Sequence, residues 1–168
     1  MIPKQRGLWC ADYKGEFQLG NRRYCYPLTI TDYRSRYLLA CEALESTRSE
    51  TALSLFEQVF KTFGLPKATR TDNGVPFASP NALFGLSRLA IWWLRLGIAI
   101  ERIRPGHPQQ NGRHERMHLT LKQETTQPPA FNLLQQQAQN QPQQRVRRAN
   151  RRNMTSRRPS LARQLPPI

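Results

Sequence analysis

Three carboxylates stand where regular elements would end or begin. Asp12 ends a short apolar run, Asp72 follows a β-type segment, and Glu115 opens a run of good helix formers. Carboxylates that converge repel one another unless hard cations lie between them, so such a group is typical of a Mg²⁺ or Mn²⁺ site. Two such ions can activate a water or a 3′-hydroxyl for in-line attack on a phosphodiester. Any one of these acids alone is more often a surface carboxylate or a turn cap.

A second metal motif overlaps the third acid. His114-Glu115-Arg116-Met117-His118 has the H-E-x-x-H pattern of zinc proteases, in which two histidines one helical turn apart bind zinc and the glutamate acts as base. That site needs a third ligand, yet beyond His118 the sequence holds no histidine and a single carboxylate, Glu124. The motif also leaves the basic charge unexplained. A zinc protease is therefore the weakest interpretation.

The charge of the chain indicates a polyanionic partner. The 168 residues carry a formal net charge of +15. Residues 1–127 hold 18 Lys and Arg against 11 Asp and Glu, and residues 128–168 hold eight Arg and no acid. A folded core with that surplus attracts nucleic acid through its phosphates, and the tail permits nonspecific DNA or RNA binding. The alternative is a merely basic surface.

Length and cysteine usage bound the class of protein. The chain is long enough for one domain with a real core plus appendages. Its three cysteines, at positions 10, 25 and 41, form no C-x-x-C pair, so they predict buried thiols in a reducing cytosol. No apolar run suits a signal peptide, and the most apolar stretch, residues 89–100, is short and interrupted by Arg95. We expect a cytoplasmic protein with no membrane role.

The elements that must position the acids follow from the hydrophobic pattern. Three strands in an antiparallel meander are predicted at residues 8–13, 24–31 and 37–41. The series Thr47-Arg48-Ser49-Glu50 fits a capping box, and apolar residues at helical spacing follow it as far as Phe63. A strand at 67–71 then leads into Asp72, where Asn73-Gly74 is expected to supply the positive φ of a sharp turn.

The second half predicts helix and strand in alternation. The expected elements are a helical region from Ser79 to Leu96, a strand at 98–103, a polar loop at 105–112 and a helix at 113–125. Gly85 weakens the first half of that helical region. Trp92 and Trp93 are interpreted as packing residues, with base stacking as the less favoured alternative. Strands followed by alternating elements imply a mixed α/β sheet, in which adjacent first and fourth strands would bring Asp12 and Asp72 together.

From residue 127 onward the composition changes to Gln, Arg, Pro and Asn with few aliphatics. Such a composition cannot bury a core, so the tail at 127–168 is predicted to be mostly disordered. A short helix is expected near residues 131–138.

Several ordered motifs resemble the DDE transposases of bacterial insertion sequences, which are kin to retroviral integrases. The motifs are Trp9-Cys-Ala-Asp12-Tyr-Lys-Gly15, Pro27-Leu-Thr-Ile-Thr-Asp32-Tyr-Arg-Ser-Arg36, Phe63-Gly-Leu-Pro66, Thr71-Asp72-Asn-Gly74 and Arg104-Pro-Gly-His-Pro-Gln-Gln-Asn-Gly-Arg-His-Glu115-Arg. The likeness spans about residues 6–125. It implies an integrase-like catalytic core at 6–126 with a ribonuclease H-like α/β fold, a mixed five-stranded sheet with flanking helices.

The resemblance also implies roles for individual residues. Asp12, Asp72 and Glu115 would be the catalytic ligands of a two-metal Mg²⁺ or Mn²⁺ site, and Asp32 a turn residue. Residues expected to contact DNA are Asn73, His107, Gln109, Asn111, Arg116 and Lys122. Family members break phosphodiester bonds at mobile-element ends and join those ends to target DNA without a covalent protein intermediate. A homo-oligomer would be the active form, nucleoid-associated in a bacterial cell.

The chain departs from that family pattern at both ends. A helix-turn-helix region usually precedes the core, whereas 11 residues precede Asp12 here. Relatives continue past the catalytic helix to an Asn, Arg-Pro-His type motif, whereas this chain turns into its Gln/Arg tail near Ala138. We therefore hold a second hypothesis, a truncated remnant that binds DNA but cannot transpose. A frameshift would explain the compositional break, and translation of the downstream DNA in all frames tests it.

Overall fold

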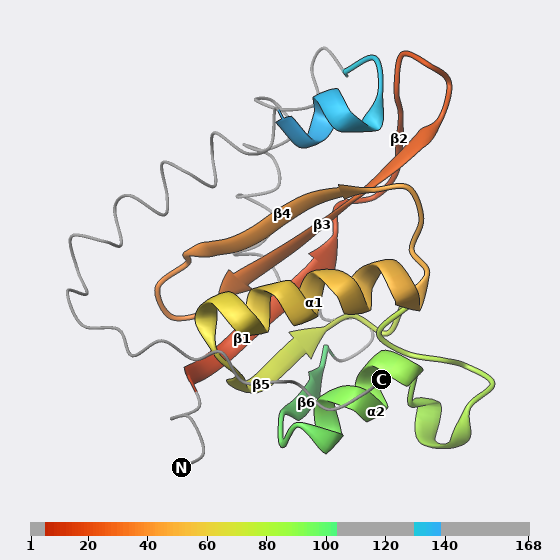
Figure 1. Ribbon diagram of the computed structural model, residues 1–168. Helices are drawn as coiled ribbons and strands as arrows, with labels where there is room; N and C mark the ends of the chain where they lie inside the picture. Colours follow the sequence, from red (N-terminus) through yellow and green to blue (C-terminus); the bar gives the residue numbers. More distant parts are fainter. Residues whose placement is uncertain (1–5, 104–129, 139–168) are drawn as a thin grey trace.

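A computed structural model describes residues 6–103 and 130–138 of the chain. The predicted loop at 105–112, the predicted helix at 113–125, the H-E-x-x-H motif and most of the predicted tail lie outside these residues. Within them a mixed sheet carries helices on one face (Figure 1).

The sheet is built around β1 (Arg6–Tyr13), which has an antiparallel neighbour on one side and a parallel neighbour on the other. The other strands are β2 (Phe17–Gln18), β3 (Tyr24–Asp32), β4 (Leu38–Leu44), β5 (Pro66–Thr71) and β6 (Ala99–Arg102). β3 pairs antiparallel with β1, β2 and β4, whereas β5 runs parallel to both β1 and β6. The predicted mixed sheet is thus confirmed. The first and fourth predicted strands, now β1 and β5, are adjacent, as predicted. The two-residue strand β2 was not predicted and makes the sheet six-stranded.

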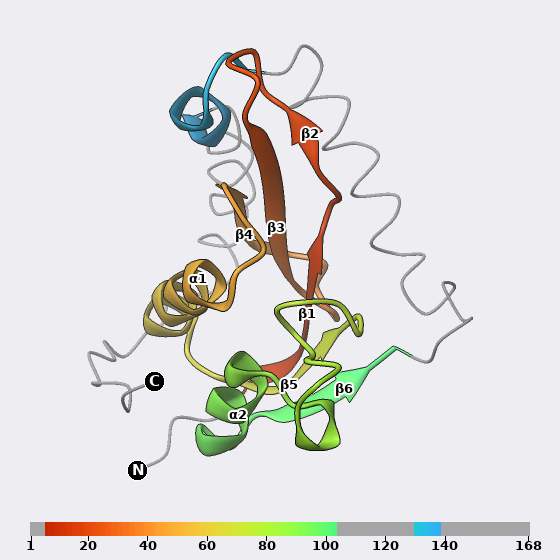
Figure 2. The same cartoon turned by 90° about the vertical axis from the view of Figure 1, so that its right-hand side faces the viewer.

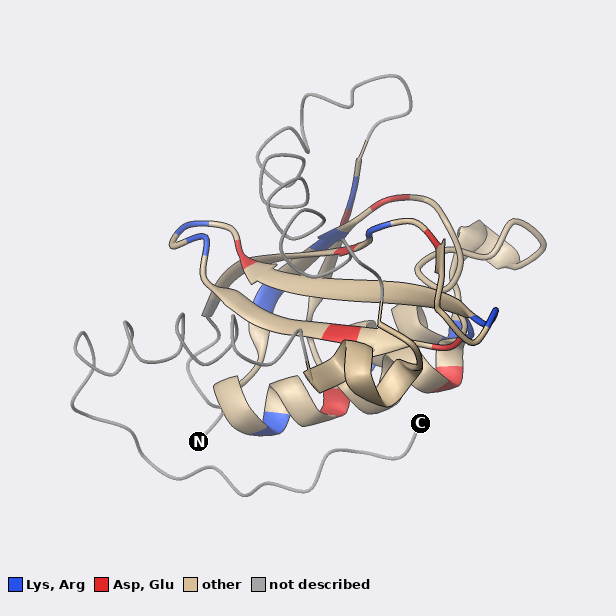
Figure 3. Ribbon diagram, turned by 90° about the horizontal axis from the view of Figure 1, so that it is seen from above, with Lys and Arg blue, Asp and Glu red and all other residues tan. Residues whose placement is uncertain are grey.

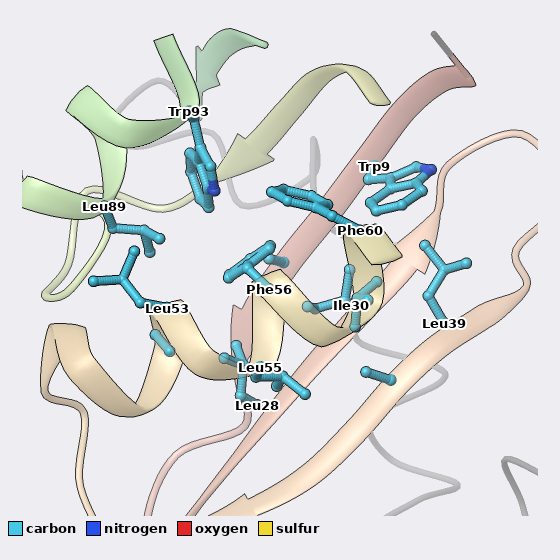
Figure 4. Close-up of a cluster of buried hydrophobic side chains, with 14 of the residues drawn as sticks. Trp9, Leu28, Ile30, Leu39, Leu53, Leu55, Phe56, Phe60, Leu89 and Trp93 are labelled. Atoms are coloured by element: carbon cyan, nitrogen blue, oxygen red, sulfur yellow. The ribbon is translucent and has the colours of Figure 1, made fainter. Parts of the chain in front are cut away.

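Helix α1 (Ser49–Phe63) lies over one face of the sheet because its apolar side chains recur at helical spacing. Helix α2 (Arg88–Arg95) joins it on the same face, as the view along the sheet shows (Figure 2). Trp93, which is fully buried, meets Phe56 of α1 edge to face with ring centroids 4.8 Å apart (Figure 4). Trp92 is 2% exposed and lies against Phe60. Both tryptophans therefore pack in the core, as predicted.

The predicted capping box at Thr47 is wrong. α1 begins at Ser49 with Arg48 at the N-cap position, and no side chain caps it. The nearby Thr51 hydroxyl instead donates to the carbonyl of Arg48 at 2.9 Å. The helix is held by its buried apolar face, so the missing cap does not prevent it from forming.

The predicted helical region from Ser79 to Leu96 is wrong in its first half. The structure has a short 3₁₀ turn, η1 (Leu83–Gly85), in which Phe84 and Gly85 both have positive φ. Helix α2 starts only after Ser87, whose hydroxyl accepts the Ala90 N–H at 3.1 Å. Ser87 rather than Ser79 is therefore the helix-starting serine.

Residues 130–138 pack against the far end of the antiparallel strands, and positions 133–138 are helical, as predicted. The N–H of Gly20 donates to the carbonyl of Ala130 at 3.0 Å, and that of Asn21 to the carbonyl of Phe131 at 2.8 Å. The Gln137 side chain donates to the carbonyl of Ala43 at 3.2 Å. These hydrogen bonds join this piece of the predicted tail to the turn before β3 and to strand β4.

Candidate active site

Asp12 lies on the sheet face opposite the helices. Along β1, Trp9 and Ala11 belong to the core beneath α1, so the alternation of a strand places Cys10 and Asp12 on the other face. The register pairs Cys10 with Arg70 of the parallel strand β5. Two residues further along each strand stand Asp12 and Asp72. Both predicted ligands are therefore positioned by the carboxyl ends of adjacent parallel strands.

The two carboxylates affect each other electrostatically. The pKa of Asp12 is raised to about 7, first because burial disfavours the charged form and second because the negative charge of Asp72 lies nearby. A hydrogen bond from the backbone N–H of Tyr13 opposes this shift. Asp12 is half-buried and lies near a second acid, so its ionised form is unfavourable. A bound cation would offset this cost by attracting both carboxylates.

A local turn holds the Asp72 side chain. Its Oδ1 accepts the backbone N–H of Gly74 at 3.0 Å, and the Asn73 side chain donates to the carbonyl of Ile103 at 3.2 Å. The predicted positive φ at this turn is wrong, because neither Asn73 nor Gly74 adopts one. Glycine matters here for another reason: a Cβ on Gly74 would lie 3.3 Å from both carboxylate oxygens of Asp72, so any larger residue would require this carboxylate to shift by a few tenths of an ångström.

The sheet face beside Asp12 carries a charged cluster that was not predicted from the sequence. Arg70 donates to one oxygen of Glu101 from Nε at 3.1 Å and from Nη2 at 2.8 Å. Its guanidinium also lies over the Tyr33 ring, 4.9 Å from the centroid. The parallel register of β5 and β6 pairs these two residues, and no local motif announces it. Arg70 thus neutralises the carboxylate of Glu101 next to the site.

The remaining predicted site residues divide between the described and undescribed parts of the chain. Asp32 is a turn residue, as predicted, because its Oδ1 accepts the N–H and the hydroxyl of Ser35, both at 2.7 Å. Glu115 and the predicted DNA contacts His107, Gln109, Asn111, Arg116 and Lys122 lie outside the described residues. Within residues 6–103 and 130–138, no three His, Cys, Asp or Glu side chains form a group that could hold a metal.

Two further predictions concern the class of protein. Cys10, Cys25 and Cys41 are all free and buried, as predicted. Among the described helices, none is long and apolar enough to cross a membrane.

Comparison with known families gives two matches, both described as an integrase core domain. One covers residues 3–108 and the other residues 96–153. The first spans more than half of the chain and includes both Asp12 and Asp72.

Curated relatives of the sequence are retroviral polyproteins. The Pol polyprotein of feline endogenous virus ECE1 is 36% identical over 104 residues, 61% of this chain and 9% of the polyprotein. The Gag-Pol polyprotein of baboon endogenous virus (strain M7) is 34% identical over 103 residues, 61% of this chain and 6% of the polyprotein. The chain thus spans less than a tenth of the length of either relative.

Solved structures share the fold. The HTLV-2 integrase catalytic core domain in complex with magnesium, in a trimeric form, matches with a TM-score of 0.56 and 17% identity, over 76% of this chain and 74% of that one. A chain of the simian T-cell lymphotropic virus intasome bound to PP2A regulatory subunit B56 gamma matches with a TM-score of 0.61 and 20% identity, over 76% of this chain and 43% of that one. The fold is therefore that of the integrase catalytic cores, which is ribonuclease H-like.

Proposed function

The chain belongs to the integrase core domain family, and from that premise we propose that it cuts and joins DNA strands by metal-dependent phosphoryl transfer. The observation that carries the proposal is the placement of Asp12 and Asp72. They lie at the carboxyl ends of the neighbouring parallel strands β1 and β5. The charge of Asp72 helps raise the pKa of Asp12 to about 7.

Asp12 and Asp72 supply oxygen ligands of the kind that Mg²⁺ and Mn²⁺ prefer, and Glu115 is proposed as the third. When bound, two such ions would activate the attacking hydroxyl and neutralise the leaving oxygen. The chain's own contribution is orientation. The Gly74 N–H fixes one oxygen of Asp72. The next residue, Asn73, is held at the end of β6 by its side-chain hydrogen bond to the Ile103 carbonyl.

The charge pattern supports a DNA substrate. The surplus of basic residues gives the chain a formal charge of +15, which favours phosphate binding and predicts strong salt dependence. Asn73 stands beside the catalytic Asp72 and is exposed, so we propose that it contacts the DNA near the scissile phosphate. The loop residues His107, Gln109 and Asn111, with Arg116 and Lys122, are proposed as further contacts. The predicted core at 6–126 and the mostly disordered tail at 127–168, apart from the described segment 130–138, remain part of this proposal.

The identity of the DNA ends is a separate proposal. Retroviral polyproteins are the relatives reported above, whereas the motif pattern predicts a bacterial insertion-sequence transposase in the cytoplasm. We propose mobile-element ends and target DNA as the substrates in either case. We further propose a homo-oligomer as the active form, since the related solved structures are described as an intasome and as a trimer.

The experiment measures nicking and strand transfer on short DNA duplexes with Mg²⁺ or Mn²⁺. The wild-type chain is compared with Asp72→Asn and Glu115→Gln, and Glu57→Gln on the exposed side of α1 is the matched control. We expect activity in the wild type and the control and none in the two site variants. DNA binding without cleavage by the wild type would favour the truncated remnant. Zinc-dependent proteolysis, measured in parallel, would overturn the proposal.

A further inference from the structure

Two arginines adopt a backbone conformation that residues with a side chain rarely take. Arg22, in the turn between β2 and β3, has a φ of +66°, and Arg36, in the turn between β3 and β4, has a φ of +57°. Glycine adopts this conformation readily, whereas the Cβ of an arginine crowds the neighbouring carbonyl. Such positions persist where the surroundings impose them, and they cluster at functional sites.

The first turn is held by hydrogen bonds on both sides of Arg22. Its N–H donates to the carbonyl of Leu19 at 2.9 Å, and its carbonyl accepts from the Gln18 side chain at 3.1 Å. The Asn21 side chain accepts the N–H of Arg23 at 3.1 Å. The bonds from Gly20 and Asn21 to residues 130–131 fix the turn from outside. The backbone that presents Arg22 and Arg23 is therefore ordered in advance of any ligand.

The second turn is held in a similar way. Asp32 closes it, because its N–H donates to the carbonyl of Tyr37 at 2.9 Å and its Oδ1 accepts the N–H of Ser35 at 2.7 Å. The Ser35 hydroxyl in turn accepts the N–H of Tyr37 at 3.4 Å. Arg34 and Arg36 extend from this turn and are exposed, and Figure 3 shows blue at the tip of the loop between β3 and β4.

The two turns lie at opposite ends of the nine-residue strand β3. The eight steps from Tyr24 to Asp32, at about 3.3 Å each, separate the two ends of the strand by roughly 26 Å, somewhat less than the ~34 Å helical repeat of duplex DNA. Among the described residues, no acid forms an ion pair with Arg22, Arg23, Arg34 or Arg36. Asp32, whose Oδ1 is engaged by Ser35, is the one acid within these two turns, so each turn keeps a net positive charge and the sheet presents two basic turns at a fixed separation.

We propose that these two basic turns bind the phosphates of duplex DNA at points separated by most of a helical turn, with Arg22 and Arg36 as the principal contacts. Guanidinium groups bind phosphate through paired N–H donors, and contacts to phosphate set position without reading sequence. The choice of DNA as the partner rests on the proposed function, whereas the ability of the two turns to bind phosphate does not. The two turns lie outside the residues assigned to metal binding or to DNA contact above.

The test uses the full chain with the double substitution Arg22→Gly and Arg36→Gly. Glycine removes each charge and relaxes the positive φ, so the thermal midpoint should stay unchanged or rise. Binding of a short duplex is measured across a series of salt concentrations. Loss of two phosphate contacts should reduce the slope of log affinity against log salt by about 1.8, and weaken binding about eightfold per contact at 0.1 M salt.

Two comparisons separate this surface from general charge. Arg22→Lys with Arg36→Lys keeps both charges and should keep most of the slope, although lysine lacks the paired donors. Arg95→Ala removes an exposed charge at the end of α2, on the helical side, and should change the slope little. An unchanged slope in the glycine variant, or an equal loss in Arg95→Ala, would overturn the inference. Absence of nicking by the wild type would count against the proposed function alone, because this test measures only binding.

Discussion

The carboxylate of Asp72 lies directly against Gly74: its Oδ1 accepts the Gly74 N–H at 3.0 Å, and a Cβ at position 74 would be 3.3 Å from both carboxylate oxygens. The side chain of a proposed metal ligand is therefore oriented by a residue at which even a methyl group would require that side chain to shift. Gly74 itself is exposed and does not adopt the positive φ that favours glycine, so its backbone conformation does not require glycine there.

Gly74→Ala should impair the site while leaving the fold intact. The methyl group would displace the Asp72 carboxylate by a few tenths of an ångström. Because misplacement by about 1 Å can cost roughly a hundredfold in rate, this smaller shift should cost about threefold to tenfold. The free energy of unfolding should change by less than about 1 kcal/mol. Strand-transfer assays measure the rate, calorimetric titration measures the Mn²⁺ affinity, and urea unfolding measures the free energy of unfolding. Full activity with unchanged Mn²⁺ affinity would show that Gly74 does not orient Asp72.

Asp12→Asn should stabilise the protein in a pH-dependent way. The pKa of Asp12 is about 7 in the folded chain against an ordinary 3.8, so between these values the folded state holds a proton that the unfolded state has lost. Wild-type stability from this group therefore falls as pH rises from about 4 to 7. Asparagine cannot ionise, so the variant should match the wild type below pH 4 and exceed it by about 1–3 kcal/mol at pH 8.

Thermal unfolding of both proteins across pH 4 to 8, without divalent cations, tests the prediction for Asp12. Added Mg²⁺ should then narrow the difference at pH 8, because a ligand that binds only the folded wild type stabilises it. A difference that is constant with pH, or that is largest at low pH, would contradict the assigned cause.

The sequence predicted the parts of the site that depend on local pattern. Asp12 and Asp72 each end a strand with clear apolar character, and their proximity required only that the two strands be neighbours. The pairing of Arg70 with Glu101 could not be predicted in this way. It depends on the parallel register of two strands whose paired residues are 31 positions apart, and nothing near either residue announces the partner.

The region between the site and α2 shows where apolar periodicity fails. Leu83 and Phe84 fitted a helical pattern, yet they are 79% and 84% exposed in a turn where Phe84 has a φ of +55°. Ser79 and Ser87 could each have started the helix that became α2, and only tertiary contacts distinguish the two serines. Ser87 is buried, and its hydroxyl donates to the Phe77 carbonyl at 3.0 Å while accepting the Ala90 N–H.

Ser87→Ala should therefore destabilise the protein. The substitution removes the N-cap of α2 and leaves the buried Phe77 carbonyl without its donor, which together cost about 1–3 kcal/mol. Urea unfolding should show a lower midpoint with an unchanged slope. Ser54→Ala is the matched control, since Ser54 is exposed in mid-helix and alanine favours helix, so its effect should stay within about 0.5 kcal/mol. Equal effects at the two serines would argue against the capping role.

Gly20 offers a test of whether residues 130–138 belong to the folded core. A Cβ on Gly20 would lie 3.0 Å from the Phe131 Cα and 3.1 Å from its ring, and a backbone atom cannot move aside cheaply. Gly20→Ala should therefore push this segment from the sheet, expose the buried side chains of Ala130 and Gln136, and lower the free energy of unfolding by about 1–3 kcal/mol.

Gly7→Ala is the matched control for this substitution, because a Cβ there meets nothing within 4 Å and the residue lies in a strand, where alanine is tolerated. Hydrogen exchange of the Gly20 and Asn21 amides, which donate to residues 130 and 131, reports on the contact itself. If both variants unfold alike and the Asn21 amide stays protected in Gly20→Ala, the segment does not depend on the glycine. If only Gly20→Ala is weakened and this protection is lost, the folded core extends past the predicted boundary at residue 126 to residue 138.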